Sequence, residues 1–210
     1  MTAKSGRFLT FEGGEGAGKS TQIKLLSKRL SEHSVDHVLT REPGGTEGAE
    51  VIRELLVSGK ANRWTPQTEI CLHYAARADH LARIINPTLE MAKWVLCDRF
   101  MDSTRAYQGS GQGGATALID QLEAAIVADS RPDLTLIMDL PAEEGLNRAQ
   151  ARSARDRYES YDLAFHERLR DSFLAIARSE PDRCVVIDAS QPVDNLSDQI
   201  WTLVSDRYLA

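Results

Sequence analysis

The sequence has few cysteines and no long apolar run. Its three cysteines, Cys71, Cys97 and Cys184, lie far apart and form no C-x-x-C pair, and an odd number cannot close a complete disulfide set. We expect all three to be buried thiols in a reducing compartment. No run of about 18 apolar residues occurs, and residues 1–7 contain no apolar signal core. We therefore expect a soluble, cytoplasmic protein that does not bind a membrane.

An excess of positive charge is also missing. The chain carries 25 lysine and arginine residues against 31 aspartate and glutamate residues, for a formal net charge of -6. Because a protein dedicated to nucleic acid presents a strongly basic face, this composition argues against a nucleic-acid partner. The N-K-x-D segment of guanine-binding switches is absent, as is any Ser-His-Asp or Cys-His pattern. The 210 residues, 42% of them hydrophobic, suffice for one domain spanning residues 1–210.

Short apolar runs alternate with amphipathic segments along the whole chain. The apolar runs predict strands at 8–11, 38–41, 94–97, 134–138 and 185–187. Apolar residues at helical spacing predict helices that begin near residue 18 and that cover 47–57, 65–89 (as one helix or two), 117–128, 162–179 and 195–208. The polar, glycine-rich stretch 101–114 suits a short helix and a flexible loop. This alternation specifies an α/β fold, with a five-stranded parallel sheet flanked by helices.

The glycine-rich stretch after the first strand carries the strongest functional signal. Gly13 and Gly18 frame the spacing G-x-x-x-x-G, and Lys19 and Ser20 follow at once. Glycines let successive backbone N–H groups point at phosphate oxygens in a turn that most side chains would obstruct. Lys19 supplies a mobile charge for the outer phosphates, and the Ser20 hydroxyl can bind Mg²⁺. With a strand before it and a helix after it, the pattern predicts a nucleotide phosphate site rather than a chance glycine-rich turn.

Charged residues follow two of the other predicted strands. Asp98 and Arg99 come directly after 94–97, and a turn-forming cluster at 42–46 follows 38–41. Ligands of open α/β sheets gather at these carboxyl ends. In a chain with a phosphate loop, Asp98 is therefore a candidate for the Mg²⁺ site, and Arg99 is a candidate for gripping a phosphate. A structural ion pair between Asp98 and an arginine is the competing interpretation.

The segment 143–158 is unusually rich in arginine. Arg148 and Arg152 lie one helical turn apart, and Arg155 and Arg157 follow. The nearby acids are too few to pair with all four guanidinium groups: Glu143, Glu144 and Asp156. A closing lid that brings positive charge to a transferring phosphoryl group explains this imbalance better than a solvated helix face does. We therefore predict an arginine-rich lid at about 148–160.

Seven short motifs, spread over nearly the whole chain, occur together in one known family. They are FEGGEGAGKST (11–21), TREPGGT (40–46), AAR (75–77), CDRF (97–100), STRAYQG (103–109), RPDLTL (131–136) and DASQP (188–192). Their order and spacing resemble those of bacterial thymidylate kinases. The resemblance implies a P-loop nucleoside monophosphate kinase fold and a homodimer. It also implies Mg²⁺-dependent transfer of the ATP γ-phosphoryl group to dTMP, in dTTP synthesis.

The resemblance also implies roles for individual residues. ATP would be bound by Gly13, Gly14, Glu15, Gly16, Ala17, Gly18, Lys19, Ser20, Thr21 and Arg148. The substrate dTMP would be bound by Glu15, Glu42, Pro43, His73, Arg77, Arg99, Ser103, Thr104, Tyr107 and Gln108. The catalytic cations would be Lys19, Arg99, Arg148, Arg152 and Arg157, and the metal would bind Ser20 and Asp98.

Within the dTMP set, the resemblance distinguishes several contacts. Arg77 and Arg99 would clamp the dTMP phosphate, and Thr104 with its neighbour would contact the thymine edge. Tyr107 would crowd the 2′ position of the sugar, and Glu15 would approach the 3′-hydroxyl. On the donor side, the lid arginine at position 148 would pack on adenine.

His73 departs from the family pattern, in which a phenylalanine stacked on thymine is common at this position. An imidazole ring can also stack, and no other histidine lies at metal-ligand spacing from it. Because composition does not distinguish thymine from uracil, a related P-loop kinase acting on UMP, dUMP or AMP is the alternative. A non-catalytic nucleotide-binding module is the alternative from a different class.

Overall fold

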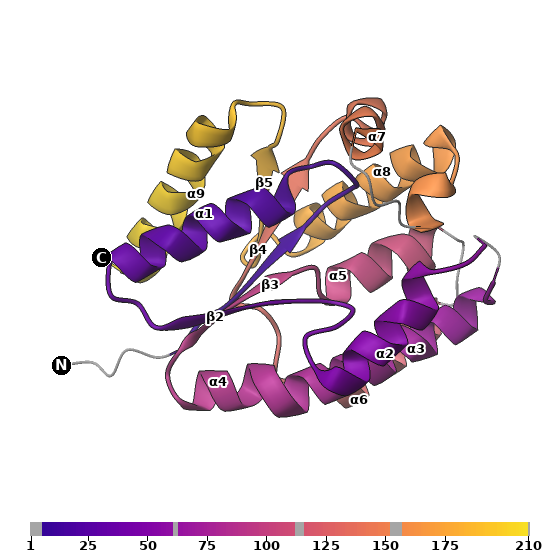
Figure 1. Ribbon diagram of the computed structural model, residues 1–210, viewed down its shortest axis with the longest axis horizontal. Coiled ribbons are helices and arrows are strands. Elements are labelled where there is room, and N and C mark those ends of the chain that lie inside the picture. The colour runs from indigo at the N-terminus through magenta and orange to yellow at the C-terminus, as the bar shows by residue number, and fades with distance from the viewer. Residues whose placement is uncertain (1–5, 61–62, 112–115, 152–156, 210) are drawn as a thin grey trace.

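A five-stranded sheet forms the centre of the computed structural model, which describes residues 6–60, 63–111, 116–151 and 157–209 (Figure 1). Every strand pair is parallel, and the strand order is β2-β3-β1-β4-β5. The strands are β1 Phe8–Glu12, β2 His37–Arg41, β3 Trp94–Asp98, β4 Leu134–Asp139 and β5 Cys184–Asp188. Each contains the run predicted from the sequence, so the α/β class is confirmed.

Helices cover both faces of the sheet because successive strand side chains point to opposite sides. Leu9 of β1 packs into one hydrophobic core, and its neighbour Phe8 packs into another. The first core contains residues of α1 (Lys19–Glu32) and α9 (Val193–Tyr208), which lie side by side in Figure 1.

The other face carries most of the remaining helices. They are α3 (Pro66–His80), α4 (Asn86–Glu90), α6 (Thr116–Ile126) and α8 (Leu163–Ser179), and α2 (Glu47–Val57) packs against α3. A π-helical segment, η1 (Leu81–Ile85), joins α3 to α4. The predicted helix 65–89 is therefore helical throughout, but its hydrogen-bonding pattern changes just ahead of Pro87.

Side-chain caps fix where three of these helices begin. Thr46, Thr65 and Asp162 each accept a hydrogen bond from the backbone N–H three residues further on. Each bond satisfies one of the unpaired donors in the first turn of α2, α3 or α8. The start of α1 differs, because Gly18 precedes it in a left-handed conformation with φ of 83° and provides no side-chain cap. The first turn of α1 can therefore present its N–H groups to an anion.

For the stretch 101–114, the predicted short helix is confirmed, but the prediction of a flexible loop was wrong for the described residues. Residues there form α5 (Met101–Thr104) and a π-helical segment, η2 (Arg105–Gly111). Ala106 and Tyr107 are buried in the core that α8 builds with β4. The polar composition of this stretch indicated an exposed loop. It was misleading because Asp102 is fully buried and forms a bidentate ion pair with Arg183, a residue remote in sequence.

The predicted lid segment is described only in part. Helix α7 (Ala142–Gln150) leads into it and a 3₁₀ turn, η3 (Arg157–Ser160), follows, whereas residues 152–156 lie outside the described part. Of the cysteines, Cys97 and Cys184 are buried as predicted, but Cys71 is exposed on α3, so that part of the expectation was wrong. Among the described helices, none combines the length and apolar character that crossing a bilayer requires.

Candidate active site

A cavity of about 980 Å³ opens at the carboxyl ends of the strands. Parts of its wall follow β1, β2, β3 and β5 in the chain: 15–21, 41–43, 98–100 and 190–193. This is the edge of a parallel sheet at which ligands bind, and the volume lies near the upper end of the range for ligand sites. The phosphate loop and the charged residues predicted from the sequence therefore share one cavity.

Close backbone packing explains two glycines of the phosphate loop. Gly13 has a φ of 132°, and a Cβ atom there would lie 2.5 Å from the carbonyl oxygen of Met138 on β4. Gly16 has a φ of 67°, and a Cβ atom there would overlap the carbonyl of Gly145 on α7. Both the left-handed backbone and the lack of space require glycine. The loop is thus held from behind by β4 and α7.

Lys19 lies within the phosphate loop rather than extending into solvent. Its Nζ donates hydrogen bonds to the carbonyl oxygens of Gly13 at 3.1 Å and Gly14 at 2.7 Å. Burial, followed by the charge of Arg99, lowers the pKa of Lys19 to about 8. The ammonium group therefore stays charged at neutral pH and is already oriented toward the space that a polyphosphate would enter.

Ser20 and Asp98 meet beside the loop. The Ser20 hydroxyl donates to Asp98 Oδ2 at 2.6 Å, and both residues line the cavity. Among the residues that the structure describes, no cluster of three or more histidine, cysteine or acidic side chains could hold a metal by itself. One carboxylate and one hydroxyl match Mg²⁺, which usually takes few protein ligands and completes its shell with water and substrate phosphates.

Arg99 crosses the floor of the cavity. Its guanidinium donates to the carbonyl of Gly13 at 3.0 Å, to Ser103 Oγ at 3.2 Å and to Glu15 Oε1 at 2.9 Å. It also lies 5.1 Å from the ring centroid of Tyr107. The backbone of Arg99 is left-handed, with a φ of 68°, a conformation that is uncommon for this residue type. The turn after β3 therefore directs the arginine back toward the phosphate loop.

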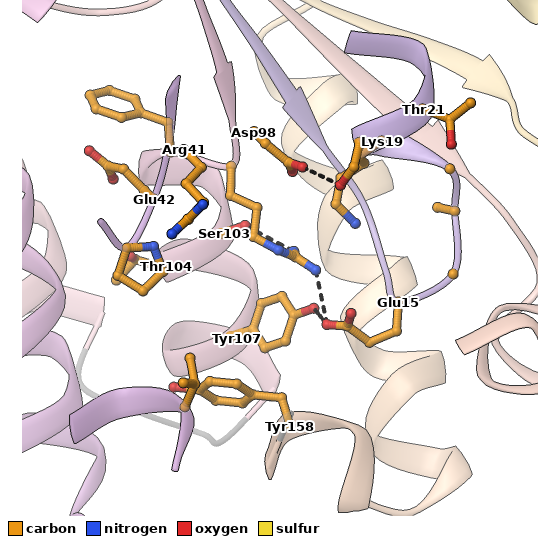
Figure 2. A pocket seen from close by; sticks show the side chains of 18 of the residues that line it. Glu15, Lys19, Thr21, Arg41, Glu42, Asp98, Ser103, Thr104, Tyr107 and Tyr158 are labelled. Carbon is orange, nitrogen blue, oxygen red and sulfur yellow. Dashed lines mark hydrogen bonds and ion pairs between the residues drawn. The ribbon is translucent and has the colours of Figure 1, made fainter. Parts of the chain in front are cut away.

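Glu15, inside the phosphate loop, is held by two donors. Besides Arg99, the Tyr107 hydroxyl donates to Glu15 Oε1 at 2.5 Å, and Figure 2 shows the two side chains pointing toward one another. Burial by itself raises the pKa of Glu15, but the charges of Arg99 and Lys19 outweigh it and hold the pKa at about 2. Glu15 is therefore ionised and offsets part of the positive charge of the loop.

Arg77 lies in a different environment, beside Glu42 and Thr104 in the cavity wall. Only 1% of its surface is exposed. Its Nε donates to Glu42 Oε2 at 2.8 Å and its Nη2 donates to Thr104 Oγ1 at 3.1 Å. The guanidinium lies between the rings of Tyr74 and Phe100, 4.7 Å and 5.0 Å from their centroids. Among the described residues, its Nη1 has no hydrogen-bond partner.

Gln108 has a fixed amide orientation. Its Nε2 donates to Glu69 Oε2 at 3.1 Å and to the Tyr158 hydroxyl at 3.3 Å. Since a carboxylate only accepts, these bonds identify which end of the amide is nitrogen. The other end, Oε1, is buried and has no partner among the described residues. Gln108 and Arg77 both line the cavity, and each has one buried polar atom without a partner among the described residues.

His73 lines the same cavity and is neutral. Burial, followed by the charges of Arg77 and Arg157, lowers the pKa of its imidazole to about 3. Its Nε2 lies 3.4 Å from the Tyr158 hydroxyl. An uncharged imidazole that lines the cavity can stack on a flat ligand, as the predicted role requires.

A sequence model of one family matches residues 11–200, and its description is Thymidylate kinase. The chain belongs to the thymidylate kinase family. It is 57% identical over 202 residues to a thymidylate kinase of Caulobacter vibrioides, covering 96% of this chain and 97% of that one. It is 49% identical over 210 residues to a thymidylate kinase of Nitrobacter winogradskyi, covering 99% and 91%.

A solved structure gives the same result. The crystal structure of thymidylate kinase from Ehrlichia chaffeensis is 37% identical to this chain and matches it with a TM-score of 0.77, covering 95% of this chain and 99% of the other. The P-loop nucleoside monophosphate kinase fold expected from the motifs is therefore confirmed.

Most of the predicted site residues of this thymidylate kinase family member line the cavity. They are Glu15, Gly16, Ala17, Gly18, Lys19, Ser20, Thr21, Glu42, Pro43, His73, Arg77, Asp98, Arg99, Ser103, Thr104, Tyr107, Gln108 and Arg148. Gly13 and Gly14 do not line it, but their carbonyls hold Lys19. Arg148 donates to the carbonyl of Ala189 at 3.2 Å and to Glu144 at 2.6 Å, next to the wall segment 190–193.

Two predicted lid arginines have other outcomes. Arg152 lies outside the described residues. Arg157 is buried, with its side chain 1% exposed, and it donates to Glu69 and to the carbonyl of Leu56 instead of lining the cavity. In this conformation the structure does not bring Arg157 to the phosphates. The count of nearby acids missed Glu69, because that partner lies 88 positions away in the chain.

Sequence reasoning also missed residues that the structure brings to the site. Arg53 of α2 and Tyr158 line the cavity. Glu12, at the end of β1, is buried and accepts hydrogen bonds from the backbone N–H of Phe100 at 2.7 Å and from Ser103 Oγ at 2.6 Å. Its position at the carboxyl end of a strand, next to the phosphate loop, was the only signal available.

Proposed function

We propose that this protein transfers the γ-phosphoryl group of ATP to dTMP, forming ADP and dTDP. The observation that carries the choice of acceptor is the pair of buried atoms without partners among the described residues, Arg77 Nη1 and Gln108 Oε1. Both residues line the cavity that also contains the phosphate loop. Family membership points to dTMP, and this pair supports a base with a carbonyl acceptor beside an N–H donor.

The two atoms complement one edge of thymine. Thymine offers a carbonyl acceptor at C4 beside an N–H donor at N3, which suits the donor of Arg77 and the acceptor of Gln108. Cytosine and adenine present an amino donor beside a ring-nitrogen acceptor, the reverse order. Either base would leave both buried protein groups unpaired, at a cost of about 1 to 3 kcal/mol for each group. Uracil and guanine present the same order of acceptor and donor as thymine, so the sugar must separate UMP from dTMP and the size of the base must exclude GMP.

This assignment revises the role implied for Arg77. Its charge is already balanced by Glu42 at 2.8 Å, and its Nη2 is bonded to Thr104, which the family resemblance relates to the thymine edge. We therefore assign Arg77 to the base carbonyl and leave the dTMP phosphate to Arg99, with Arg53 close by in the same wall. A buried, neutralised arginine suits a directional hydrogen bond better than a dianion.

The chemistry requires charge placement rather than a general base. A phosphomonoester has a second pKa of about 6, so the attacking phosphate is largely dianionic at neutral pH. The difficulty is to bring two polyanions together in line. Lys19 and Arg99 supply fixed positive charge around the loop, and the first turn of α1 adds its N–H groups. A well-placed cation in such reactions contributes about 10³ to 10⁵ in rate.

Further assignments rest on the resemblance together with this geometry. Ser20 and Asp98 would hold Mg²⁺, which when bound neutralises charge on the ATP phosphates. Arg148 would pack on adenine next to 190–193. Tyr107 would crowd the 2′ position, and Glu15 would approach the 3′-hydroxyl. Arg152 stays the predicted lid cation, and closure of the lid would exclude water and prevent hydrolysis of ATP.

The remaining proposals concern the cell and the assembly. We infer a cytoplasmic homodimer without a nucleic-acid partner, on the family resemblance and on the net charge of -6. Light scattering coupled to size-exclusion chromatography measures the assembly, and a mass of 23.3 kDa, that of a single chain, would contradict it.

An ADP-release assay with ATP and Mg²⁺ tests the reaction. We expect turnover with dTMP, weaker turnover with dUMP, and kcat/KM lower by roughly 10² for dCMP, AMP and UMP. The Lys19→Ala variant serves as the control for contaminating kinases. Comparable rates with dCMP and dTMP would contradict the assignment of Arg77 and Gln108, and no ADP with any acceptor would favour a non-catalytic nucleotide-binding module.

A further inference from the structure

Behind Arg77 lies a chain of buried hydrogen bonds that the reaction itself does not use. Arg77 Nε donates to Glu42 Oε2, and the other carboxylate oxygen, Oε1, lies 3.0 Å from Nδ1 of His80. The second ring nitrogen of His80, Nε2, lies 2.7 Å from Thr40 Oγ1. The side chains of Arg77, Glu42 and His80 are exposed by 1%, 4% and 0%.

The chemistry of the partners sets the tautomer of His80. A carboxylate oxygen can only accept, so in the neutral ring the proton must be on Nδ1, where it is donated to Glu42. Nε2 is then an acceptor, and the Thr40 hydroxyl donates to it. The order of donation is Thr40 to His80, His80 to Glu42, and Arg77 to the second oxygen of the same carboxylate.

The surrounding backbone packs closely against one part of this arrangement, His80 and Thr40. Gly45 has a φ of 90°, and a Cβ atom there would lie 2.7 Å from both His80 Nε2 and Thr40 Oγ1. The turn after β2 thus closes directly over the pair. His80 is the last residue of α3 and Arg77 lies one turn earlier on the same helix, so both side chains are presented to Glu42 from one rigid element.

We propose that His80 is a positioning residue that determines which bases the acceptor site takes, by fixing Glu42 and, through it, Arg77. The inference rests on the proposed function, in which Arg77 Nη1 meets the C4 carbonyl of a pyrimidine. Without the donor on Nδ1, Glu42 Oε1 loses its partner in the described part of the chain. The carboxylate is then free to rotate, and the guanidinium that it orients is no longer held toward a carbonyl-bearing base.

A matched pair of substitutions isolates that single donor. The amide nitrogen of asparagine can replace Nδ1–H of histidine as a donor. The amide of glutamine lies at the position of Nε2, where its oxygen can accept from Thr40. His80→Asn therefore keeps the donor toward Glu42, whereas His80→Gln keeps only the contact with Thr40. Thr40→Val removes the other end of the chain and leaves Glu42 and Arg77 joined to His80.

The readout is kcat/KM for dTMP and for dCMP, with KM for ATP and the melting temperature of each variant. We expect His80→Gln to lower the dTMP-to-dCMP ratio roughly 10-fold through a higher KM for dTMP, with KM for ATP unchanged. His80→Asn and Thr40→Val should keep the ratio within about 3-fold of the parent protein. A structural role alone would make the two His80 variants lose activity equally, and that result, or an unchanged ratio in His80→Gln, would overturn the proposal.

A measurement on the unaltered protein keeps the proposal testable if His80→Gln does not fold. Long-range ¹H–¹⁵N spectra report which ring nitrogen of a histidine carries the proton. We expect the Nδ1–H tautomer for His80, and the Nε2–H tautomer would overturn the inference. Absence of any turnover of dTMP by the unaltered protein would instead overturn the proposed function, and the inference with it.

Discussion

Two arginines in one cavity have different surroundings, and we propose opposite uses for them. Arg99, whose side chain is 18% exposed, contacts a backbone carbonyl, a hydroxyl and Glu15 in the phosphate loop. Arg77, with 1% of its side chain exposed, is neutralised by Glu42 and enclosed by two aromatic rings. At Arg99, positive charge stays within reach of an anion. At Arg77, the charge is balanced by Glu42 and the guanidinium is held in a fixed orientation. Binding a polyanion requires field strength, whereas selecting a base requires orientation.

Two acids of the same strand and loop repeat this contrast. Glu12 and Glu15 are three residues apart, yet the pKa of Glu12 is raised to about 7 and that of Glu15 is lowered to about 2. For Glu12, burial dominates and the nearby charge of Asp102 adds to it. For Glu15, the charges of Arg99 and Lys19 outweigh burial. The two carboxyls therefore differ because burial and Asp102 prevail at Glu12, whereas Arg99 and Lys19 prevail at Glu15.

Lys19→Ala is the most direct test of the phosphate loop. The ammonium group is fixed by two loop carbonyls, and no described residue beside Arg77 takes its place. We expect kcat to fall by about 10³, with the dTMP-to-dCMP ratio unchanged, in steady-state ADP-release assays. Lys24→Ala, on the exposed side of α1, is the matched control. Equal activity of the two variants would contradict the assignment of the phosphate loop.

Arg99→Ala separates the two arginines. We expect kcat/KM for dTMP to fall by about 10², with a higher KM for dTMP and a lower kcat, because the clamp also aligns the attacking phosphate. Raising the salt concentration should weaken dTMP binding less in this variant than in the parent protein, since a phosphate contact has been removed. A loss of base discrimination with normal phosphate binding would reverse the roles that we give to Arg99 and Arg77. Arg83→Ala, at an arginine whose side chain is 70% exposed, is the control.

Glu12→Gln tests the difference between the two acids through the pH dependence of protein stability. Because burial raises the pKa of Glu12 from its ordinary value of 4.5 to about 7, Glu12 binds a proton in the folded state that the unfolded state releases. Its stabilising contribution is complete below about pH 4.5 and is lost as the pH rises through 7. Denaturant unfolding at pH 5 and at pH 7.5 measures how far the free energy of unfolding falls between these two pH values. We expect this fall to be larger in the parent protein than in Glu12→Gln, by up to about 3 kcal/mol.

Glu15→Gln should give the opposite sign when unfolding is measured at about pH 2.5 and pH 5, because between pH 5 and pH 7.5 this carboxyl is ionised in both the folded and the unfolded state. The lowered pKa of Glu15 means that its contribution is present above about pH 4.5 and is lost as the pH falls toward 2. If both variants had the same pH dependence, the two acids would not lie in different electrostatic surroundings.

Tyr107→Phe should have the mildest effect. It removes the hydroxyl that donates to Glu15 but keeps the ring beside Arg99. We expect kcat/KM for dTMP to fall roughly 3- to 10-fold, as for the loss of one hydrogen bond. The preference for dTMP over UMP should persist because the ring still occupies the space near the sugar. Relaxed sugar discrimination in this variant would assign that role to the hydroxyl.

Local signals in the sequence were enough for the sheet and for the phosphate site. Each strand is a short apolar run, and the spacing from Gly13 to Ser20 reflects backbone geometry that few other sequences can adopt. Contacts between remote segments were not accessible in the same way. The burial of Arg157 depends on Glu69, and the helical conformation of 105–111 depends on packing against α8. The divided roles of Arg77 and Arg99 required knowing which acid faces each of them.

The contact between Gly16 and Gly145 has a consequence for the choice of phosphoryl donor. Backbone meets backbone there, and Arg148 lies one turn beyond Gly145 on α7. We expect the Arg148 guanidinium to cover adenine. Rigid main-chain packing therefore sets its distance from the phosphate loop. We therefore expect a donor with two or four phosphates in place of three to place its purine out of register with Arg148.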